Sequence, residues 1–243
     1  MSVTKHKVES LLERIGRIDW PRLRLELDTD GYALTERLLL SAECDQLVRS
    51  YSEDGLFRSR VVMARHNFGR GEYRYFAEPL PTLVSELREL FYPQLAIIAN
   101  LWAERMGRAE RYPATLGEFL KVCSKSDQQK PTPLILRYEK DDCNCLHQDI
   151  YGEVGFPLQV ASVLSRVDDD YTGGEFLLNE QRPRSQTRGE AITITQGQFI
   201  VFPNRYRPVR GSRGDYRVNM RHGVSRLRSG TRYALGIIFH NGK

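Results

Sequence analysis

The pattern of apolar residues changes at Pro131, and this change constrains the possible folds more than any other feature of the sequence. Beyond Pro131, apolar and polar residues alternate with a period of two, and Gly or Pro interrupts the alternation at short intervals. Such a pattern is typical of antiparallel strands in a sandwich or jelly roll. The predicted strands are 133–139, 156–166, 174–179, 190–195, 198–203, 216–222 and 232–240.

The first 130 residues show mainly helical patterns. Apolar residues at helical spacing predict a short amphipathic helix within 1–20, which Trp20-Pro21 is expected to close. A longer apolar stripe predicts a helical tract over 79–107, and Pro93 is expected to break it into two helices. The other expected elements are a strand at 31–35, a helix at 41–52 and a helix at 113–124.

Helices followed by strands predict an α+β fold in which N-terminal helices brace one face of a jelly roll. No internal repeat and no Ser/Gly-rich linker divides the chain. We therefore expect one domain over 1–243, with 1–130 as mainly helical support containing a few strands and 131–243 as the jelly-roll core.

Composition narrows the function only a little. The formal net charge of +5 favours anionic partners mildly, and arginine makes up 29 of the 36 basic residues. Arginine suits the recognition of carboxylates and phosphates, although GC-rich coding also explains its excess. Four cysteines without the spacing of a disulfide framework, and no apolar run long enough to cross a bilayer, predict a cytoplasmic protein without a membrane role. Nothing in the sequence implies an obligate protein partner.

A candidate metal site begins at His147 and Asp149, within Leu-His-Gln-Asp at 146–149. Residues i and i+2 of an extended segment point to the same side, so an imidazole and a carboxylate can meet there. These are two of the three ligands of the 2-His-1-carboxylate triad of non-haem Fe(II) oxygenases. The third should be a later histidine, for which His222 is the better candidate, because His240 lies at a C-terminus expected to fray.

Arg232 supplies a reason for such a metal to be present. A 2-oxo acid chelates Fe(II) through its keto oxygen and the neighbouring carboxylate, and a fixed guanidinium is the best partner for its distal carboxylate. If His222 ends one strand and Arg232 begins the next, both line the same mouth of the barrel. Tyr138, on the strand leading towards His147, can add a phenol donor to that carboxylate.

The ordered set His147-x-Asp149, His222 and Arg232 resembles the 2-oxoglutarate/Fe(II)-dependent dioxygenases, in the arrangement of their prolyl 4-hydroxylase-like branch. The supporting matches are Leu-Arg-Tyr at 136–138, Gly-Gly-Glu at 173–175, Gly-x-Phe-Ile-Val-Phe-Pro at 197–203 and Gly-x-Arg at 230–232. The resemblance implies a double-stranded β-helix, the jelly roll of these enzymes. It also implies Fe(II), 2-oxoglutarate and O2, with oxidation of a substrate C–H bond and release of succinate and CO2.

The tract 216–226, with Ile-Ile-Phe-His at 237–240, resembles a bacterial oxygenase family assigned to oxidative demethylation of damaged nucleic acid. The implied role is DNA repair, with alkylated DNA or RNA as the partner. Two other functions remain open at this point: a hydroxylase of a protein side chain or small metabolite, and a binding protein that uses the same fold without turnover.

Two segments depart from the pattern of the superfamily. Cys143 and Cys145 alternate with His147, so a zinc site competes with the iron triad, and two small packing thiols are the simpler explanation. Residues 204–221 form an arginine-dense segment that is expected to be a loop. It is interpreted either as a phosphate-binding rim beside the active site or as a solvated loop. The candidate substrate-binding residues within it are Arg205, Arg207, Arg210 and Arg217.

Residues 56–77 combine five arginines with several aromatic residues. Aromatic rings can stack on bases while arginines meet phosphates, so this stretch is a candidate nucleic-acid surface. A half-buried pair of strands with a charged outer face explains the same pattern. We expect the pair of strands.

Overall fold

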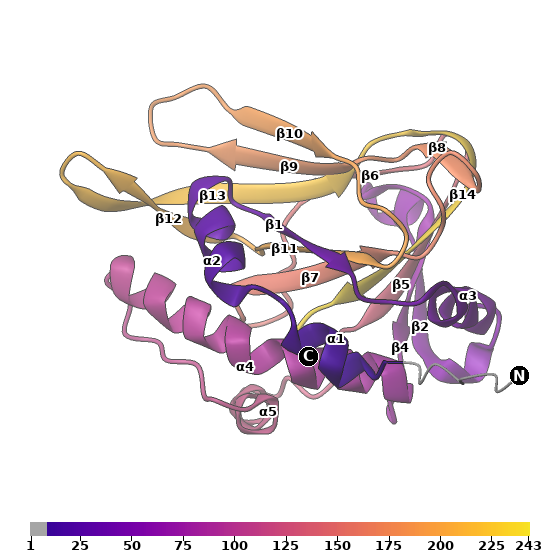
Figure 1. Cartoon of the computed structure of the whole chain (residues 1–243), viewed down its shortest axis with the longest axis horizontal. Helices are drawn as coiled ribbons and strands as arrows, with labels where there is room; N and C mark the ends of the chain where they lie inside the picture. Colours follow the sequence, from indigo (N-terminus) through magenta and orange to yellow (C-terminus); the bar gives the residue numbers. More distant parts are fainter. Residues whose placement is uncertain (1–8) are drawn as a thin grey trace, which may run out of the picture.

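The computed structural model of the protein describes residues 9–243 (Figure 1). Two antiparallel sheets lie face to face, and helices cover the outer face of one sheet, which gives three layers (Figure 1). The arrangement confirms the predicted α+β fold, a jelly roll braced by helices. Residues 1–8, the beginning of the segment 1–20 in which the first helix is predicted, lie outside the described residues.

The larger of the two sheets, called here the major sheet, has the strand order β1-β11-β7-β14-β5-β4-β2, and β8 pairs with β14 outside this path. Its strands come from both halves of the sequence, so the strands of the first 130 residues extend the jelly roll. The strands are β1 (Ala33–Arg37), β2 (Phe57–Val62), β4 (Glu72–Phe76), β5 (Leu134–Glu139), β7 (Leu158–Val163), β8 (Tyr171–Gly173), β11 (Gln198–Pro203) and β14 (Leu227–Ile237).

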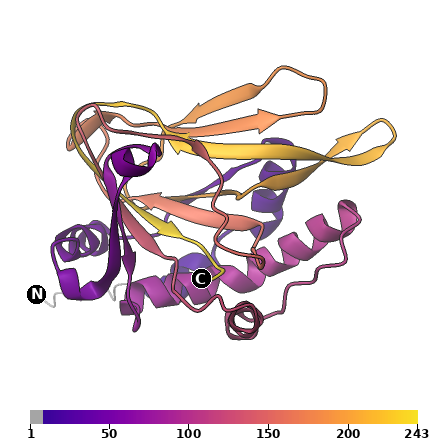
Figure 2. The same ribbon diagram turned by 180° about the vertical axis from the view of Figure 1, so that it is seen from behind.

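The second sheet, called here the minor sheet, has the order β10-β9-β13-β6-β3, with β12 paired to β13. The β12–β13 hairpin projects beyond the sandwich, as the view from behind shows (Figure 2). The strands are β3 (Gly69–Arg70), β6 (Cys143–His147), β9 (Phe176–Gln181), β10 (Arg188–Ile192), β12 (Tyr206–Gly211) and β13 (Gly214–Val224). The predicted loop at 204–221 is therefore wrong, because most of it is this hairpin, whereas the predicted strand at 216–222 is confirmed as part of β13.

The helices pack on the outer face of the major sheet, where α4 runs beneath the strands (Figure 1). The helices are α1 (Leu11–Gly16), α2 (Trp20–Thr29), α3 (Ser41–Ser50), α4 (Thr82–Arg105) and α5 (Leu116–Lys125), with short 3-10 helices at Asp54–Leu56 and Met63–His66. None of the helices within residues 9–243 is both long and apolar enough to span a membrane.

α4 is one helix of 24 residues, so the predicted break at Pro93 is wrong. A proline inside a helix costs about 3 kcal/mol, because it removes one backbone hydrogen bond and crowds the preceding turn. On either side of Pro93, α4 buries Phe91 and Trp102 together with several leucines and alanines. Each large side chain buried contributes about 1.5–3 kcal/mol, so packing on the sheet outweighs the cost of the proline.

Trp20-Pro21 begins a helix and does not close one, which corrects a second expectation. The helix within 1–20 is the short α1, and α2 starts at Trp20 with Pro21 in its first turn. Proline is tolerated there because the first backbone N–H groups of a helix have no partner within the helix. Asp19 caps α2, since its Oδ1 accepts a hydrogen bond from the backbone N–H of Arg22 at 3.0 Å.

Residues 56–77 form the expected pair of strands, with β2 antiparallel to β4 and β4 joined to β5. Their arginines mostly contact groups within the protein. The guanidinium of Arg58 lies 4.4 Å from the centre of the Tyr75 ring, and Arg60 forms an ion pair with Glu72. These contacts favour the interpretation as half-buried strands.

The C-terminal segment is fixed to the helical layer, so the expectation of a frayed end is wrong. Backbone hydrogen bonds of 3.0 and 2.9 Å join Lys130 and Gly242. The buried guanidinium of Arg88 on α4 donates to the carbonyl oxygens of Ile238 and Phe239 at 3.1 and 2.8 Å. His240 is consequently buried, with only 1% of its surface exposed.

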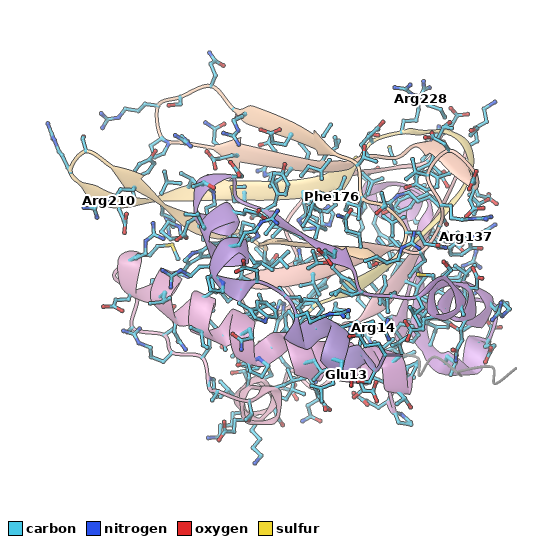
Figure 3. All side chains as sticks on the ribbon, viewed as in Figure 1. Glu13, Arg14, Arg137, Phe176, Arg210 and Arg228 are labelled. Carbon is cyan, nitrogen blue, oxygen red and sulfur yellow. The ribbon has the colours of Figure 1, made fainter. Side chains whose placement is uncertain are left out.

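Arg207 is completely buried and does not lie on a substrate rim, which corrects its predicted role. Its guanidinium forms an ion pair with Glu180 of β9, and it donates to the carbonyl oxygen of Asp28 at 2.8 Å. Because successive side chains of β12 point to opposite faces of the sheet, Arg207 faces the interior. Arg210 is exposed at the tip of the hairpin (Figure 3). Arg207 thus joins the hairpin to the end of α2.

Replacing Arg207 with Met should lower the free energy of unfolding by about 3 kcal/mol, because Glu180 would stay buried with one cation fewer beside it. Urea unfolding monitored by circular dichroism measures this change. The matched control is Arg210→Met on the same hairpin, whose side chain is 79% exposed, and the expected change there is within about 0.5 kcal/mol. A loss below about 1 kcal/mol for Arg207→Met would show that the ion pair does not hold the hairpin.

Candidate metal centre

His147 and His222 face each other across two strands of the minor sheet. His147 is the last residue of β6, and it is the direct register partner of His222 on β13. Directly opposed residues of antiparallel strands place their Cβ atoms about 4.5–5.5 Å apart. The two imidazole rings accordingly lie with their centroids 4.2 Å apart.

The pairing of β6 and β13 is irregular just beside this point. His222 pairs with His147 but Val224 pairs with Asn144, so β6 has one more residue than β13 in this interval. Such a bulge changes the direction of a side chain, and bulges are frequent next to active sites. The strands are also very close here, since a Cβ added at Gly223 would lie 2.6 Å from the carbonyl oxygen of Asn144. Only glycine fits at that position without a shift of the backbone.

Asp149 completes the cluster from the loop that follows β6. Its Oδ2 lies 3.2 Å from Nε2 of His222, and its Oδ1 lies 3.6 Å from Nε2 of His147. One ligand atom from each of the three residues lies within 4.8 Å of the others. This geometry can hold one metal ion through two imidazole nitrogens and one carboxylate oxygen.

The surrounding groups fix the orientation of these side chains. Nδ1 of His147 is 2.8 Å from the carbonyl oxygen of Cys145, to which an Nδ1–H would donate, so that Nε2 keeps its lone pair towards Asp149. The Tyr151 hydroxyl donates to Oδ1 of Asp149 at 2.7 Å. The backbone N–H of Asp149 donates to Oδ1 of Asn204 at 2.8 Å, and the Asn204 amide donates back to the carbonyl oxygen of Asp149.

The electrostatic environment favours a carboxylate and a neutral imidazole, the forms that bind metals. Burial opposes ionisation of Asp149, but the hydrogen bond with His222 and the nearby imidazoles hold the pKa of that carboxyl well below its usual range. Burial, followed by the proximity of His147, lowers the pKa of His222. Nε2 of His222 and Oδ2 of Asp149, which lie 3.2 Å apart, are therefore both suited to bind one metal ion.

Arg232 and Tyr138 lie in the same cavity as the cluster, on the major sheet. They are direct register partners on β14 and β5, and both are almost completely buried. Nε and Nη1 of Arg232 and the hydroxyl of Tyr138 are buried without a hydrogen-bond partner, and no ion pair within residues 9–243 includes Arg232. A buried guanidinium without an anion is energetically costly, so this end of the cavity is suited to a carboxylate ligand.

One cavity of about 270 Å³ connects the two ends. Its polar lining includes the cluster, Arg232 and Tyr138, together with Asn144, Gln148 and Ser162, and most of the other lining side chains are apolar. Phe176 projects between the sheets (Figure 3), and Phe202 packs edge-on against His222 with ring centroids 4.8 Å apart. The cavity can therefore hold a small dianion that reaches from the cluster to Arg232 while apolar walls exclude water.

The other predicted candidates lie elsewhere. Among residues 9–243, the only group of three or more potential metal ligands is His147, Asp149 and His222, so neither Cys143 nor Cys145 belongs to a zinc site there. His240 does not line the cavity, and its Nδ1 accepts a hydrogen bond from the backbone N–H of Phe156 at 3.2 Å. Of the predicted substrate arginines, Arg205 and Arg217 line a groove beside Gln148, whereas Arg210 lies at the hairpin tip.

Four supporting residues were not predicted from the sequence. Tyr151 and Asn204 hold Asp149, and the Gln148 amide donates to Oδ1 of Asn219 and to the carbonyl oxygen of Met220, both at 2.7 Å. The position of Tyr151, two residues after Asp149, is a local signal that could have indicated its role. Asn204 and Asn219 lie far along the chain from the residues they contact, so only the fold reveals them.

Tyr151→Phe should weaken the binding of Co(II) or Mn(II) about 10- to 100-fold, because Asp149 loses the donor that orients its carboxylate. Isothermal titration calorimetry on the protein without metal measures the affinity. Tyr92→Phe is the matched control, since it also removes a buried hydroxyl, one that has no hydrogen-bond partner within the described residues and lies outside the cavity. Equal affinities for the two variants would exclude a positioning role for Tyr151.

Known proteins resemble this chain in sequence and in fold. A family described as "Oxygenase, catalysing oxidative methylation of damaged DNA" matches residues 71–242. Two relatives, both uncharacterized proteins of Mycobacterium tuberculosis, are 49% identical over 193 residues, which cover 79% of this chain and 80% of each relative.

Solved structures share the fold at low sequence identity. A Pseudomonas putida prolyl-4-hydroxylase matches with a TM-score of 0.53 and 13% identity, over 92% of this chain and 99% of that protein. A Trichoplax adhaerens prolyl hydroxylase matches with a TM-score of 0.54 and 17% identity, over 98% and 94% of the two chains. An oxidoreductase of the 2OG-Fe(II) oxygenase family from Burkholderia pseudomallei matches with a TM-score of 0.52 and 16% identity, over 93% of this chain and 94% of that protein.

These matches confirm the resemblance inferred from the sequence motifs. The family match covers more than two thirds of the chain, including the His-x-Asp motif, the later histidine and the arginine. The chain belongs to this family of oxygenases, and its jelly roll is that of the 2-oxoglutarate/Fe(II)-dependent dioxygenases.

Proposed function

We propose that the protein is an Fe(II)- and 2-oxoglutarate-dependent dioxygenase. In this proposal His147, Asp149 and His222 hold the metal, and Arg232 with Tyr138 holds the distal carboxylate of 2-oxoglutarate. The observation that carries it is the buried guanidinium of Arg232, which forms no ion pair within residues 9–243 and lies in the same cavity as the histidine–carboxylate cluster. Metal binding alone would not require that cation, whereas a chelating dicarboxylate does.

The donor set fits iron. Two imidazoles and one carboxylate on one side of a metal leave further positions open, as in non-haem Fe(II) oxygenases. When bound, Fe(II) with 2-oxoglutarate and O2 supplies oxidation of a substrate C–H bond, and succinate and CO2 are released. The protein positions the reactants and keeps water away.

Each protein group has a distinct task in this scheme. Arg232 fixes the far end of the cosubstrate through two or more N–H donors, and the Tyr138 hydroxyl is a further donor there. Burial raises the pKa of Tyr138, so its hydroxyl remains a donor at neutral pH. Phe176 and Phe202 cover His222 and reduce the access of water to the metal side of the cavity.

We further propose alkylated nucleic acid as the substrate. The family description, which names damaged DNA, and the net charge of +5 support this choice. That description speaks of oxidative methylation, but hydroxylation of an N-methyl group gives an unstable N-hydroxymethyl group. This loses formaldehyde and leaves the base with N–H. Oxidation of such a substrate therefore removes the methyl group, and we propose demethylation.

Arg232→Gln should raise the KM for 2-oxoglutarate about 100-fold, which corresponds to about 3 kcal/mol for losing one side of a buried charge pair. Succinate formation by the Fe(II)-loaded protein measures this effect. Arg232→Lys should recover part of the loss, because it restores the charge without the planar fork. The control is Arg226→Gln, a side chain 71% exposed near the start of the same strand. An unchanged KM in Arg232→Gln would mean that another group holds the cosubstrate.

A panel of N-methylated oligonucleotides, peptides and amino acids tests the substrate. The expected result is formaldehyde release that equals succinate formation with methylated oligonucleotides, and the loss of both in His147→Ala. A gain of one oxygen on a peptide or amino acid, with no response to oligonucleotides, would replace the proposal with a protein or metabolite hydroxylase. Absence of 2-oxoglutarate turnover under all conditions would leave the alternative of a binding protein.

A further inference from the structure

We propose that a groove beside the metal cavity is a phosphate-binding site for the backbone of a nucleic-acid strand. The groove, called here the arginine groove, has a volume of about 440 Å³. Its lining residues are Gln148, Gln181, Arg182, Pro183, Arg205, Tyr206, Arg217, Asn219 and Arg221. The importance of this site for catalysis rests on the function proposed above, but the binding of phosphate itself needs neither metal nor turnover.

The groove carries positive charge that has no carboxylate partner among the described residues. Arg182 has a carboxylate partner in Glu180, at 2.5 Å, and Glu180 also pairs with the buried Arg207. Within the described part of the chain, neither an ion pair nor a side-chain hydrogen bond involves the guanidinium of Arg205, Arg217 or Arg221. An anion entering the groove thus meets three cations without having to displace a carboxylate.

The arginines are gathered by the local structure. The guanidiniums of Arg205 and Arg217 lie 4.7 and 4.3 Å from the centre of the Tyr206 ring, so they are no more than about 9 Å apart. Arg217, Asn219 and Arg221 alternate along β13 with the buried Val218 and Met220. Since alternate residues of a strand share one face, all three point to the groove side of the sheet.

Gln148 joins the groove to the metal cavity. It lies between His147 and Asp149 in the sequence, and its side chain lines both spaces. Its amide is held by Oδ1 of Asn219 and the carbonyl oxygen of Met220, both at 2.7 Å, so the shared wall is fixed. A phosphate bound in the groove would lie on the opposite side of this wall from the candidate metal.

The chemistry of the two spaces suggests a division of tasks. The metal cavity has aromatic and apolar walls, including Phe68 and Tyr73, which suit a planar base. Tyr206 is the only aromatic residue that lines the groove among the described residues, and two guanidiniums pack against its ring. It is therefore poorly placed to stack on a base. The groove offers guanidinium and amide donors, which suit phosphate oxygens. We therefore infer that the groove binds a phosphodiester beside the nucleotide that enters the cavity.

Fluorescence anisotropy of a labelled single-stranded DNA 12-mer, measured at several salt concentrations without added metal, tests this site. Arg205→Gln, Arg217→Gln and Arg221→Gln should each weaken binding about 3- to 10-fold. Each should also reduce, by about 0.7, the magnitude of the slope of the logarithm of the binding constant against the logarithm of the salt concentration. This is the value for one phosphate contact to a single strand. Arg217→Lys should keep most of that slope while losing affinity, because it retains the charge but not the fork.

Arg210→Gln is the matched control. It removes the same charge from the same hairpin, four residues beyond Tyr206, which is roughly 13 Å along the strand. Binding within about twofold of the unaltered protein is expected for this variant. Equal losses in Arg210→Gln and the groove variants would overturn the proposal in favour of diffuse attraction by the whole surface. Displacement of the DNA by a glutamate 12-mer as efficiently as by unlabelled DNA would overturn it in favour of an acidic peptide.

The same variants separate this proposal from the proposed function. If the DNA binds with the predicted salt dependence but methylated DNA releases no formaldehyde, the groove remains a phosphate site and the proposed substrate fails. If methylated DNA is turned over while the groove variants bind it as well as the unaltered protein does, the enzyme proposal stands and the groove proposal fails.

Discussion

The antiparallel register between β6 and β13 determines the candidate metal centre. It places His147 opposite His222, and it places Asp149 just beyond the end of β6. A slip of one residue would turn His222 out of the cavity and bring Arg221 in, because successive residues of a strand face opposite sides. The bulge in β6 and the close approach at Gly223 make the pairing locally specific, so that the chemistry depends on backbone geometry as much as on the three side chains.

The buried arginines of the protein differ in what they contact, and this difference separates structural from functional roles. Arg88 donates to backbone carbonyls, and Arg207 pairs with Glu180 and a carbonyl. Arg14, in the N-terminal helix α1, pairs with Glu43 (Figure 3). Arg232 is equally buried, yet two of its nitrogens have no hydrogen-bond partner among residues 9–243. Since an unpaired buried cation destabilises a fold, this arginine is the basis for the proposed cosubstrate site.

Local patterns in the sequence predicted much of the fold and the cluster. A short apolar run that follows Gly197 and ends at Pro203 placed β11 at 198–203 without error, and the spacing of His147 and Asp149 is itself a local signal. The wrong predictions arose where packing and ion pairs between distant parts of the chain outweighed the local preference of the sequence. Pro93 signals a helix break, but its cost is smaller than the gain from packing α4 on the sheet. In the sequence, the arginines of the β12–β13 hairpin resembled those of a charged loop. The burial of Arg207 depends on an ion pair with Glu180, which lies 27 residues away and gives no local signal.

Asp149 lies on a loop, but its backbone is held almost as a strand would hold it. Asn204 bonds both the N–H and the carbonyl of Asp149, and the neighbouring Gln148 is fixed to β13. Fixing the backbone of one residue costs about 1–2 kcal/mol of conformational entropy. The loop is already ordered in the folded protein. Binding of a metal ion would therefore require little further ordering of the carboxylate. The centre is therefore preorganised, and its affinity for a metal can reflect the ligands themselves.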